Sequence, residues 1–306
     1  MKRGLRIGLL LPAIGTLSAA GGSNMQGDEQ VARSWQKYLS RSDSVESVTL
    51  YGASSPREQQ LDVLIHFNPF LELHENTKNI LYLQNAFPES RYKGGVLGVF
   101  QQVRNRFSGF VFTSRKLMKA CTDGAVVPFA TDPEVFFPQP SDVYRVPVAF
   151  VGNDIRGAAV NQQYLSPAIP LGLVIYGNHW APPLSKACRG KLPMEDLPKL
   201  YSSALINLNA HLADHIRWET INLRIFDIFA CGGFIISDHH PGLFEEFGDC
   251  LVYTEGHEGL WAKIVKHLAD ADDRHKRSTT GREIVLSRHT YAHRAMDLVT
   301  YLNALA

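Results

Sequence analysis

The chain has 306 residues, a length that suits two domains of about 150 residues, each large enough for its own hydrophobic core. Its 31 Lys and Arg residues nearly balance its 30 Asp and Glu residues, so no basic field favours a nucleic acid as partner. The sequence contains no apolar run of about 18 residues and therefore predicts no transmembrane helix.

The four cysteines indicate a reducing environment. Cys121, Cys188, Cys231 and Cys250 do not form a CxxC pair. In a chain of this length, such residues are typical of reduced, buried thiols. We therefore expect a cytoplasmic protein.

The N-terminal stretch allows two interpretations. Residues 1–20 contain basic residues, an apolar run and then small residues, an order that imitates a signal peptide. The alternative is a first strand over 5–11 that leads into a Gly-rich loop, as at the start of a nucleotide-binding α/β domain. Pro12 and Gly15 interrupt the apolar run, so we expect the strand.

The following residues alternate between strand and helix patterns, which predicts an open α/β sheet. The expected strands are 47–51, 61–67, 79–84, 109–113 and 125–128, and the expected helices are 30–39, 94–105 and 114–120.

Polar residues follow two of these strands. His66 and Asn68 come at the end of one, and Gln84 and Asn85 at the end of the next. Open parallel sheets bind ligands at this edge, so all four residues are candidates for binding a ligand. His66 is also a candidate general acid or base, although a lone histidine is more often structural.

The second domain is expected to open with a strand over 146–151. Gly152 and Asn153 follow it, and Arg156 comes shortly after. A Gly turn lets backbone N–H groups approach a diphosphate, and Arg adds a planar fork of donors. The next strand, 173–176, also ends in a glycine, Gly177.

A helix over 194–202 and a strand over 204–208 come next. His211, Asp214 and His215 follow that strand and resemble a metal cluster. No fourth ligand is evident, so we predict no metal site.

The most informative stretch runs from Trp218 to Phe247. It predicts an apolar helix that begins near Thr220 and carries only Arg224 and Asp227 as charged residues. Gly-Gly at 232–233 ends this helix, and a β-branched run then predicts a buried strand. A helix this apolar should be buried, so its charged residues need partners.

This stretch resembles the donor-binding motif of group 1 glycosyltransferases of the GT-B fold, in particular the spore-maturation-protein-like branch. That branch has "R-x-F-E-x-x-A-C-G-G-F", and this chain has Arg224-Ile-Phe-Asp227-Ile-Phe-Ala-Cys-Gly-Gly-Phe. The broader family pairs two glutamates eight positions apart. Glu219 and Asp227 have this spacing, with Asp in place of the second Glu.

The resemblance implies an α/β protein with two Rossmann-like, doubly wound domains that face each other across a cleft. The segment 128–138 resembles the family's connection between domains, and the closing "H-T-Y-x-x-R" matches 289–294. We expect an acceptor-side domain over 1–142, a nucleotide-sugar-binding domain over 143–288, and a helix over 289–306 that crosses back to the first domain.

The resemblance also implies roles for individual residues. Glu219 would accept hydrogen bonds from sugar hydroxyls, and Asp227 would hold the ribose diol. The expected donor-binding residues are Gly21, Gly22, Gly152, Asn153, Arg156, Gly177, Lys191, Leu192, Glu219, Thr220, Asn222, Leu223, Arg224 and Asp227. The expected catalytic residues are His66, Arg156 and Glu219. The expected acceptor-binding residues are His66, Asn68, Gln84 and Asn85. Arg224 could instead form a structural ion pair with Asp227, three residues on.

The implied function is transfer of a sugar from a nucleoside diphosphate sugar to a glycan or small-molecule acceptor, with retention and without a metal or other cofactor. The sequence does not indicate the donor base, the donor sugar or the oligomeric state. Residues 91–93, Arg-Tyr-Lys, leave contact with a membrane surface open. Two alternatives are a sugar-nucleotide epimerase-like enzyme on the same frame and a two-domain ligand-binding protein with a signal peptide.

Overall fold

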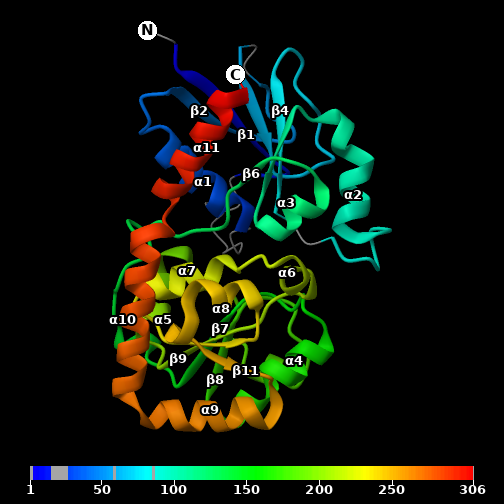
Figure 1. Cartoon of the computed structure of the whole chain (residues 1–306). Coiled ribbons are helices and arrows are strands. Elements are labelled where there is room, and N and C mark those ends of the chain that lie inside the picture. The colour runs from blue at the N-terminus through cyan, green and yellow to red at the C-terminus, as the bar shows by residue number, and fades with distance from the viewer. Residues whose placement is uncertain (1–2, 15–26, 58–59, 85–86, 306) are drawn as a thin grey trace.

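A computed structural model describes residues 3–14, 27–57, 60–84 and 87–305. It contains two parallel β-sheets, each packed against helices (Figure 1). The first sheet has the order β2-β1-β3-β4-β5-β6 and the second the order β11-β10-β9-β7-β8. This arrangement confirms the α/β fold with two doubly wound domains.

The strands of the first sheet are β1 (Leu5–Leu11), β2 (Val45–Gly52), β3 (Val63–His66), β4 (Lys78–Leu83), β5 (Gly109–Phe112) and β6 (Ala125–Val126). Its helices are α1 (Gly27–Leu39), α2 (Gly95–Val103) and α3 (Arg115–Cys121). The run predicted as the first strand is therefore β1, which pairs with β2 on one side and with β3 on the other.

The strands of the second sheet are β7 (Val148–Val151), β8 (Leu173–Tyr176), β9 (Ile206–Asn209), β10 (Ile235–Asp238) and β11 (Val252–Thr254). Its helices are α4 (Ala158–Tyr164), α5 (Leu197–Ser203), α6 (Ala213–Trp218), α7 (Leu223–Ala230), α8 (Pro241–Phe247), α9 (His257–Ala269) and α10 (Ala271–Arg288). The last helix, α11 (Tyr291–Leu305), lies against the first sheet.

Strand order locates the expected binding edge in each sheet. The chain adds strands on one side of β1 and then on the other, and it does the same around β7. Connections leave the sheet in opposite directions at these points, which opens a crevice at the carboxyl ends of the strands. The β7–β9 crevice is fully within the described residues, whereas much of the loop after β1 is not.

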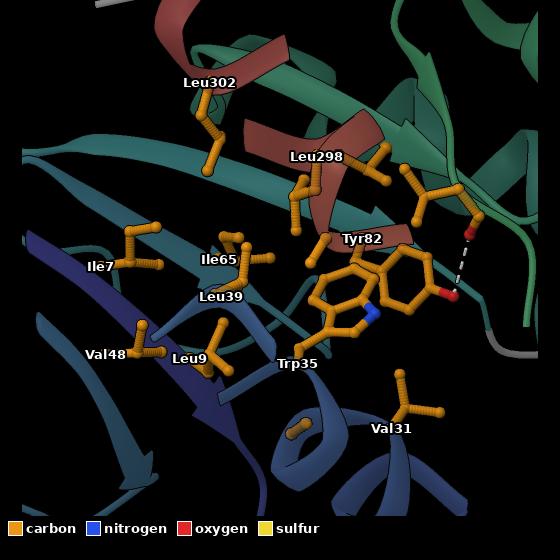
Figure 2. Packing of buried hydrophobic residues seen from close by; sticks show 14 of the residues in the cluster. Ile7, Leu9, Val31, Trp35, Leu39, Val48, Ile65, Tyr82, Leu298 and Leu302 are labelled. Atoms are coloured by element: carbon orange, nitrogen blue, oxygen red, sulfur yellow. Dashed lines mark hydrogen bonds between the residues drawn. The ribbon is translucent and has the colours of Figure 1, made fainter. Parts of the chain in front are cut away.

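The core of the first domain depends on α11. Trp35 of α1 lies beside Tyr82 of β4, with ring centroids 4.6 Å apart. Tyr82 donates a hydrogen bond to the Val127 carbonyl, and Leu298 and Leu302 of α11 close the same cluster (Figure 2). The C-terminal helix therefore contributes core side chains to the N-terminal sheet.

The two crossings between the sheets lie side by side. Thr131, on the way from β6 to β7, pairs with Thr290, on the way from α10 to α11. Arg294 donates to the carbonyls of Pro128 and Phe129 and to His289 Nδ1. These bonds join the segment that leaves the first sheet to the segment that returns to it, at one junction between the domains.

None of the described helices is long and apolar enough to cross a membrane.

Replacing Leu298 by Ala should lower the free energy of unfolding of the first domain by about 2–5 kcal/mol, because the side chain is fully buried and its removal leaves a cavity. Urea unfolding followed by tryptophan fluorescence measures this change. Met296→Ala is the matched control on the same helix, since Met296 is 63% exposed. Equal effects of the two substitutions would contradict the packing of α11 described above.

Candidate functional site

Two arginines converge on the glycine that follows β7. A Cβ atom placed on Gly152 would lie 3.0 Å from Nη2 of Arg224 and 3.4 Å from Nη1 of Arg156. Each guanidinium also lies 4.9 Å from the centroid of the Phe150 ring. Because Gly152 has no side chain, both guanidinium groups can lie close to its backbone.

The two charges have no acidic partner. Among the described residues, no carboxylate lies within ion-pair distance of either guanidinium. Arg156 instead donates to the carbonyls of Ala210 and Asn153, and Arg224 to Oδ1 of Asn209. Burial and the neighbouring Arg224 charge lower the pKa of Arg156 to about 9, and burial also lowers the pKa of Arg224. The site is therefore a partly desolvated positive centre that an anion would stabilise.

The start of α7 lies at the same place, although three residues later than predicted. The helix begins at Leu223, with Asn222 as its N-cap residue. The expected start near Thr220 was wrong because Glu219 ends α6 in a left-handed conformation, with φ 56°. Thr220 then bonds back to the His215 carbonyl. A helix start offers free N–H groups and a positive dipole end to an anion.

A buried polar network connects this start to the end of β9. Asn222 donates to Asn209 Oδ1, the same atom that accepts from Arg224, and its own Oδ1 bonds His215 Nδ1. Asn209 in turn donates to Ser237. Sequence reasoning did not assign a role to Asn209, although its place after a predicted strand was a usable signal.

His211 and His215, which resemble part of a metal cluster in the sequence, form other contacts in the structure. His211 bonds Asp238 through its ring at 2.7 Å and through its backbone N–H at 2.7 Å. Burial is the main reason that the pKa of His215 is lowered to about 4. Within the described part of the chain, no group of three or more potential ligands is close enough to hold a metal ion.

The structure places Glu219 and Thr220 against the first domain. Lys116 of α3 bonds Glu219 Oε1 at 2.9 Å, and Thr113 bonds the Thr220 hydroxyl at 2.9 Å. Nothing in the sequence pattern pointed to Lys116, because it lies about a hundred residues away on another domain.

Asp227 also lies between the domains. Its two oxygens accept hydrogen bonds from Gln30 of α1, at 2.9 Å, and from Thr131, at 2.8 Å. It is 3% exposed, and burial raises its pKa to about 8. The structural ion pair with Arg224 is not formed, because both side chains have other partners. Because α7 begins at Leu223, Asp227 lies just over one turn into the helix.

The role expected for His66 was wrong in its geometry. The imidazole is fully buried, bonds Asn79 at 2.9 Å and packs edge-on to Phe107. Burial lowers its pKa to about 4, so it is neutral at pH 7. His66 is therefore a core residue. Its position at the end of a strand locates it at the binding edge of the sheet, but does not show whether its side chain points into the core or towards a ligand. Asn68 is used locally, where it accepts from the Phe70 N–H.

Gln84 is placed at the interface as expected of a binding residue. It lines a small cavity with Thr113 of the first domain and with Asp214, His215 and Thr220 of the second. It is 5% exposed, and neither its amide oxygen nor its nitrogen has a partner among the described residues. Gly21, Gly22 and Asn85 lie outside the described residues.

The remaining predicted donor residues have different surroundings. Gly177 lies so close to the backbone of Gly152 that a Cβ atom on Gly177 would be 2.0 Å from the Gly152 carbonyl oxygen. Asn153 accepts from the Asn178 N–H, which joins the loops after β7 and β8. Leu192 packs on the side of the second sheet, and Lys191 is exposed.

Known proteins identify this architecture. Residues 159–300 match the family model described as "Glycosyl transferase-like". The search of curated proteins finds no significant match.

Solved structures are similar over nearly the whole chain. Sucrose-phosphate synthase from Thermosynechococcus elongatus has 12% identity, with 98% of this chain and 99% of that chain covered at a TM-score of 0.68. HepE from Anabaena, solved with UDP and glucose, has 11% identity, 98% and 100% coverage and a TM-score of 0.69. AviGT4, a glycosyltransferase of avilamycin A biosynthesis, has 16% identity, 98% coverage of both chains and a TM-score of 0.62.

These matches agree with the two sheets and with the crevice after β7. They do not distinguish the spore-maturation-protein-like branch from others. The chain has the GT-B glycosyltransferase fold, and its residues 159–300 match the glycosyl transferase-like family.

Proposed function

We propose that this chain is a glycosyltransferase that moves a sugar from a nucleoside diphosphate sugar to an acceptor held between the two domains. The observation that carries this proposal is the pair Arg156 and Arg224, two guanidinium groups without an acidic partner among the described residues. They converge on Gly152 at the start of α7. A diphosphate would supply the negative charge and the acceptor oxygens that the two guanidinium groups need.

The same groups suit the chemistry of transfer. When the bond between sugar and diphosphate breaks, negative charge develops on the leaving phosphate oxygen. Arg156, Arg224 and the first N–H groups of α7 are fixed before the reaction, so they stabilise this charge without reorganisation. Phe150, in contact with both cations, keeps water away from one side of them.

The two carboxylates receive separate tasks in this proposal. Glu219 is half-buried and has Oε2 without a partner among the described residues, so it accepts hydrogen bonds from sugar hydroxyls. A ribose diol would have to compete with Gln30 and Thr131 for Asp227. We propose that Asp227 holds the ribose only after the Gln30 contact opens.

The finer points of the reaction rest on the resemblance. Retention of configuration, hexosyl transfer and independence of a metal ion belong to the proposal. HepE, a similar structure, binds UDP and glucose, so UDP-glucose is the first donor to test. With His66 buried, the acceptor side retains Gln84 as its candidate, whose unpartnered amide suits a hydroxyl group.

The epimerase-like alternative needs a catalytic carboxylate on the first domain. The part of the interdomain cavity that the first domain contributes consists of Gln84, Val96, Thr113 and Leu117. Arg156 and Arg224 do not line this small cavity, so its composition does not bear on the choice, and a measurement without acceptor distinguishes the two reactions. Epimerisation would convert the donor in the absence of any acceptor.

Thermal-shift measurements with UDP, GDP, ADP and dTDP test the donor site. A ligand that binds only the folded state raises the melting temperature. We expect one diphosphate to do so, and we expect Arg156→Ala and Arg224→Ala each to weaken its binding about tenfold or more, because each removes a charge-assisted hydrogen bond.

Arg145→Ala is the matched control, since Arg145 is an exposed arginine before β7 with no side-chain hydrogen bond or ion pair among the described residues. It should leave nucleotide binding unchanged. Absence of stabilisation by all four diphosphates, or equal losses in the control and the site variants, would contradict the proposed donor site.

The raised pKa of Asp227 gives a separate prediction about stability. Its carboxyl binds a proton up to about pH 8 in the folded protein, but only up to about pH 4 when unfolded. The unfolding free energy of the wild type should therefore fall as pH rises from about 4 to about 8, by at most about 1.4 kcal/mol per pH unit relative to Asp227→Asn.

Urea unfolding of both proteins across this pH range measures the difference. Asn at 227 can still accept a hydrogen bond from Thr131, so this contact between the domains is retained while the titrating carboxyl group is removed. Parallel pH profiles for wild type and variant would show that Asp227 does not titrate in this range.

A further inference from the structure

Three contacts join the beginning of α3 to the turn after α6. The Thr113 and Thr220 hydroxyls bond at 2.9 Å, Ser114 donates to the Trp218 carbonyl, and Lys116 Nζ lies 2.9 Å from Glu219 Oε1. We call this set of contacts the seam. All three cross from the first domain to the second, and none is part of the arginine site.

The turn after α6, which the seam contacts, has an unusual backbone conformation. Glu219 has φ 56°, a left-handed value that residues other than Gly, Asn and Asp seldom adopt. Its N–H bonds the Ile216 carbonyl, and the next N–H, of Thr220, bonds the His215 carbonyl. These bonds fix the backbone of Glu219, so the remaining freedom is in its side chain.

Lys116 removes that freedom. It occupies Oε1 of Glu219 and leaves Oε2 without a partner among the described residues. The side chains of Lys116 and Glu219 are 48% and 33% exposed, and an ion pair this exposed contributes little to folding stability. Its effect is on orientation, because a carboxylate already held in one rotamer loses less entropy when it binds a hydroxyl.

We propose that Lys116 is a positioning residue for the donor sugar: from the acceptor-side domain, it orients Glu219 so that the free oxygen accepts hydrogen bonds from sugar hydroxyls. This assignment rests on the proposed function. The nucleotide end of the donor would then be bound by the second domain alone, through Arg156 and Arg224. The sugar end would be recognised only when the two domains are closed on each other.

Because the nucleotide end and the sugar end of the donor would be bound by different residues, two ligands test the proposal. UDP probes the nucleotide end, and UDP-glucose probes both ends; if another base binds, the corresponding diphosphate and sugar conjugate replace them. Calorimetric titration of Lys116→Met should show about three- to tenfold weaker binding of UDP-glucose, because the entropy of immobilising the Glu219 side chain is then lost on binding. Binding of UDP should change by less than about twofold, since the variant leaves the arginine site intact.

Matched variants separate positioning from folding. Lys119→Met removes an exposed lysine from the same helix, one turn away and without a side-chain contact among the described residues, and it should behave as the wild type. Lys116→Arg keeps the charge and should restore the preference for UDP-glucose over UDP. In Glu219→Gln, the additional substitution Lys116→Met should have little further effect, because the two residues act as one unit.

The outcomes are distinguishable. If Lys116→Met weakens UDP and UDP-glucose equally, or weakens neither while wild type binds both, the positioning role is wrong and the donor site stands. If wild type binds none of the nucleoside diphosphates, the proposed function itself is contradicted, together with the role of Lys116 that rests on it.

Discussion

Two like charges held against one glycine are the constraint on which the site depends. Arg156 and Arg224 share the space beside Gly152, and burial lowers the pKa of both. Protein side chains of neutral character, above all Asn209, satisfy part of their hydrogen-bonding capacity without neutralising the charge. Such an arrangement costs stability in the free protein, and a bound anion removes that cost.

The second feature is that both domains contribute contacts to the proposed donor site. Glu219 and Asp227, the carboxylates at the two ends of the motif, are held by Lys116 and Gln30 of the first domain. The chain then returns through α10 to α11, whose side chains complete the first core. The relative position of the domains and the geometry of the donor-binding residues are therefore coupled through the same few contacts.

Sequence reasoning predicted the sheets well and the side chains unevenly. Buried parallel strands such as β1 are continuous apolar runs bounded by turn residues, so their positions are visible in the sequence. Helices α4, α6 and α8 have six or seven residues, too few to show a clear period, and were not predicted. Helix α3 is equally short, but Ser114 marked its start as an N-cap residue. The motif pointed to Arg224, and the strand followed by a Gly turn pointed to Gly152 and Arg156; the structure brings these three residues together.

The failures have a common physical origin. His66 follows a strand as a binding residue should, but its ring turns into the core. The partners of Asp227 lie 96 and 197 positions away, and those of Glu219 are equally remote. No local pattern encodes such contacts, because tertiary packing decides them after the elements have formed.

The most direct test of the proposed donor site is a crystal structure of the wild-type chain with the nucleoside diphosphate that stabilises it most. The proposed donor site predicts a diphosphate between Arg156 and Arg224, with its oxygens at the first N–H groups of α7. A diphosphate bound elsewhere, with the two guanidinium groups still unoccupied, would contradict the central claim that this pair forms the donor site.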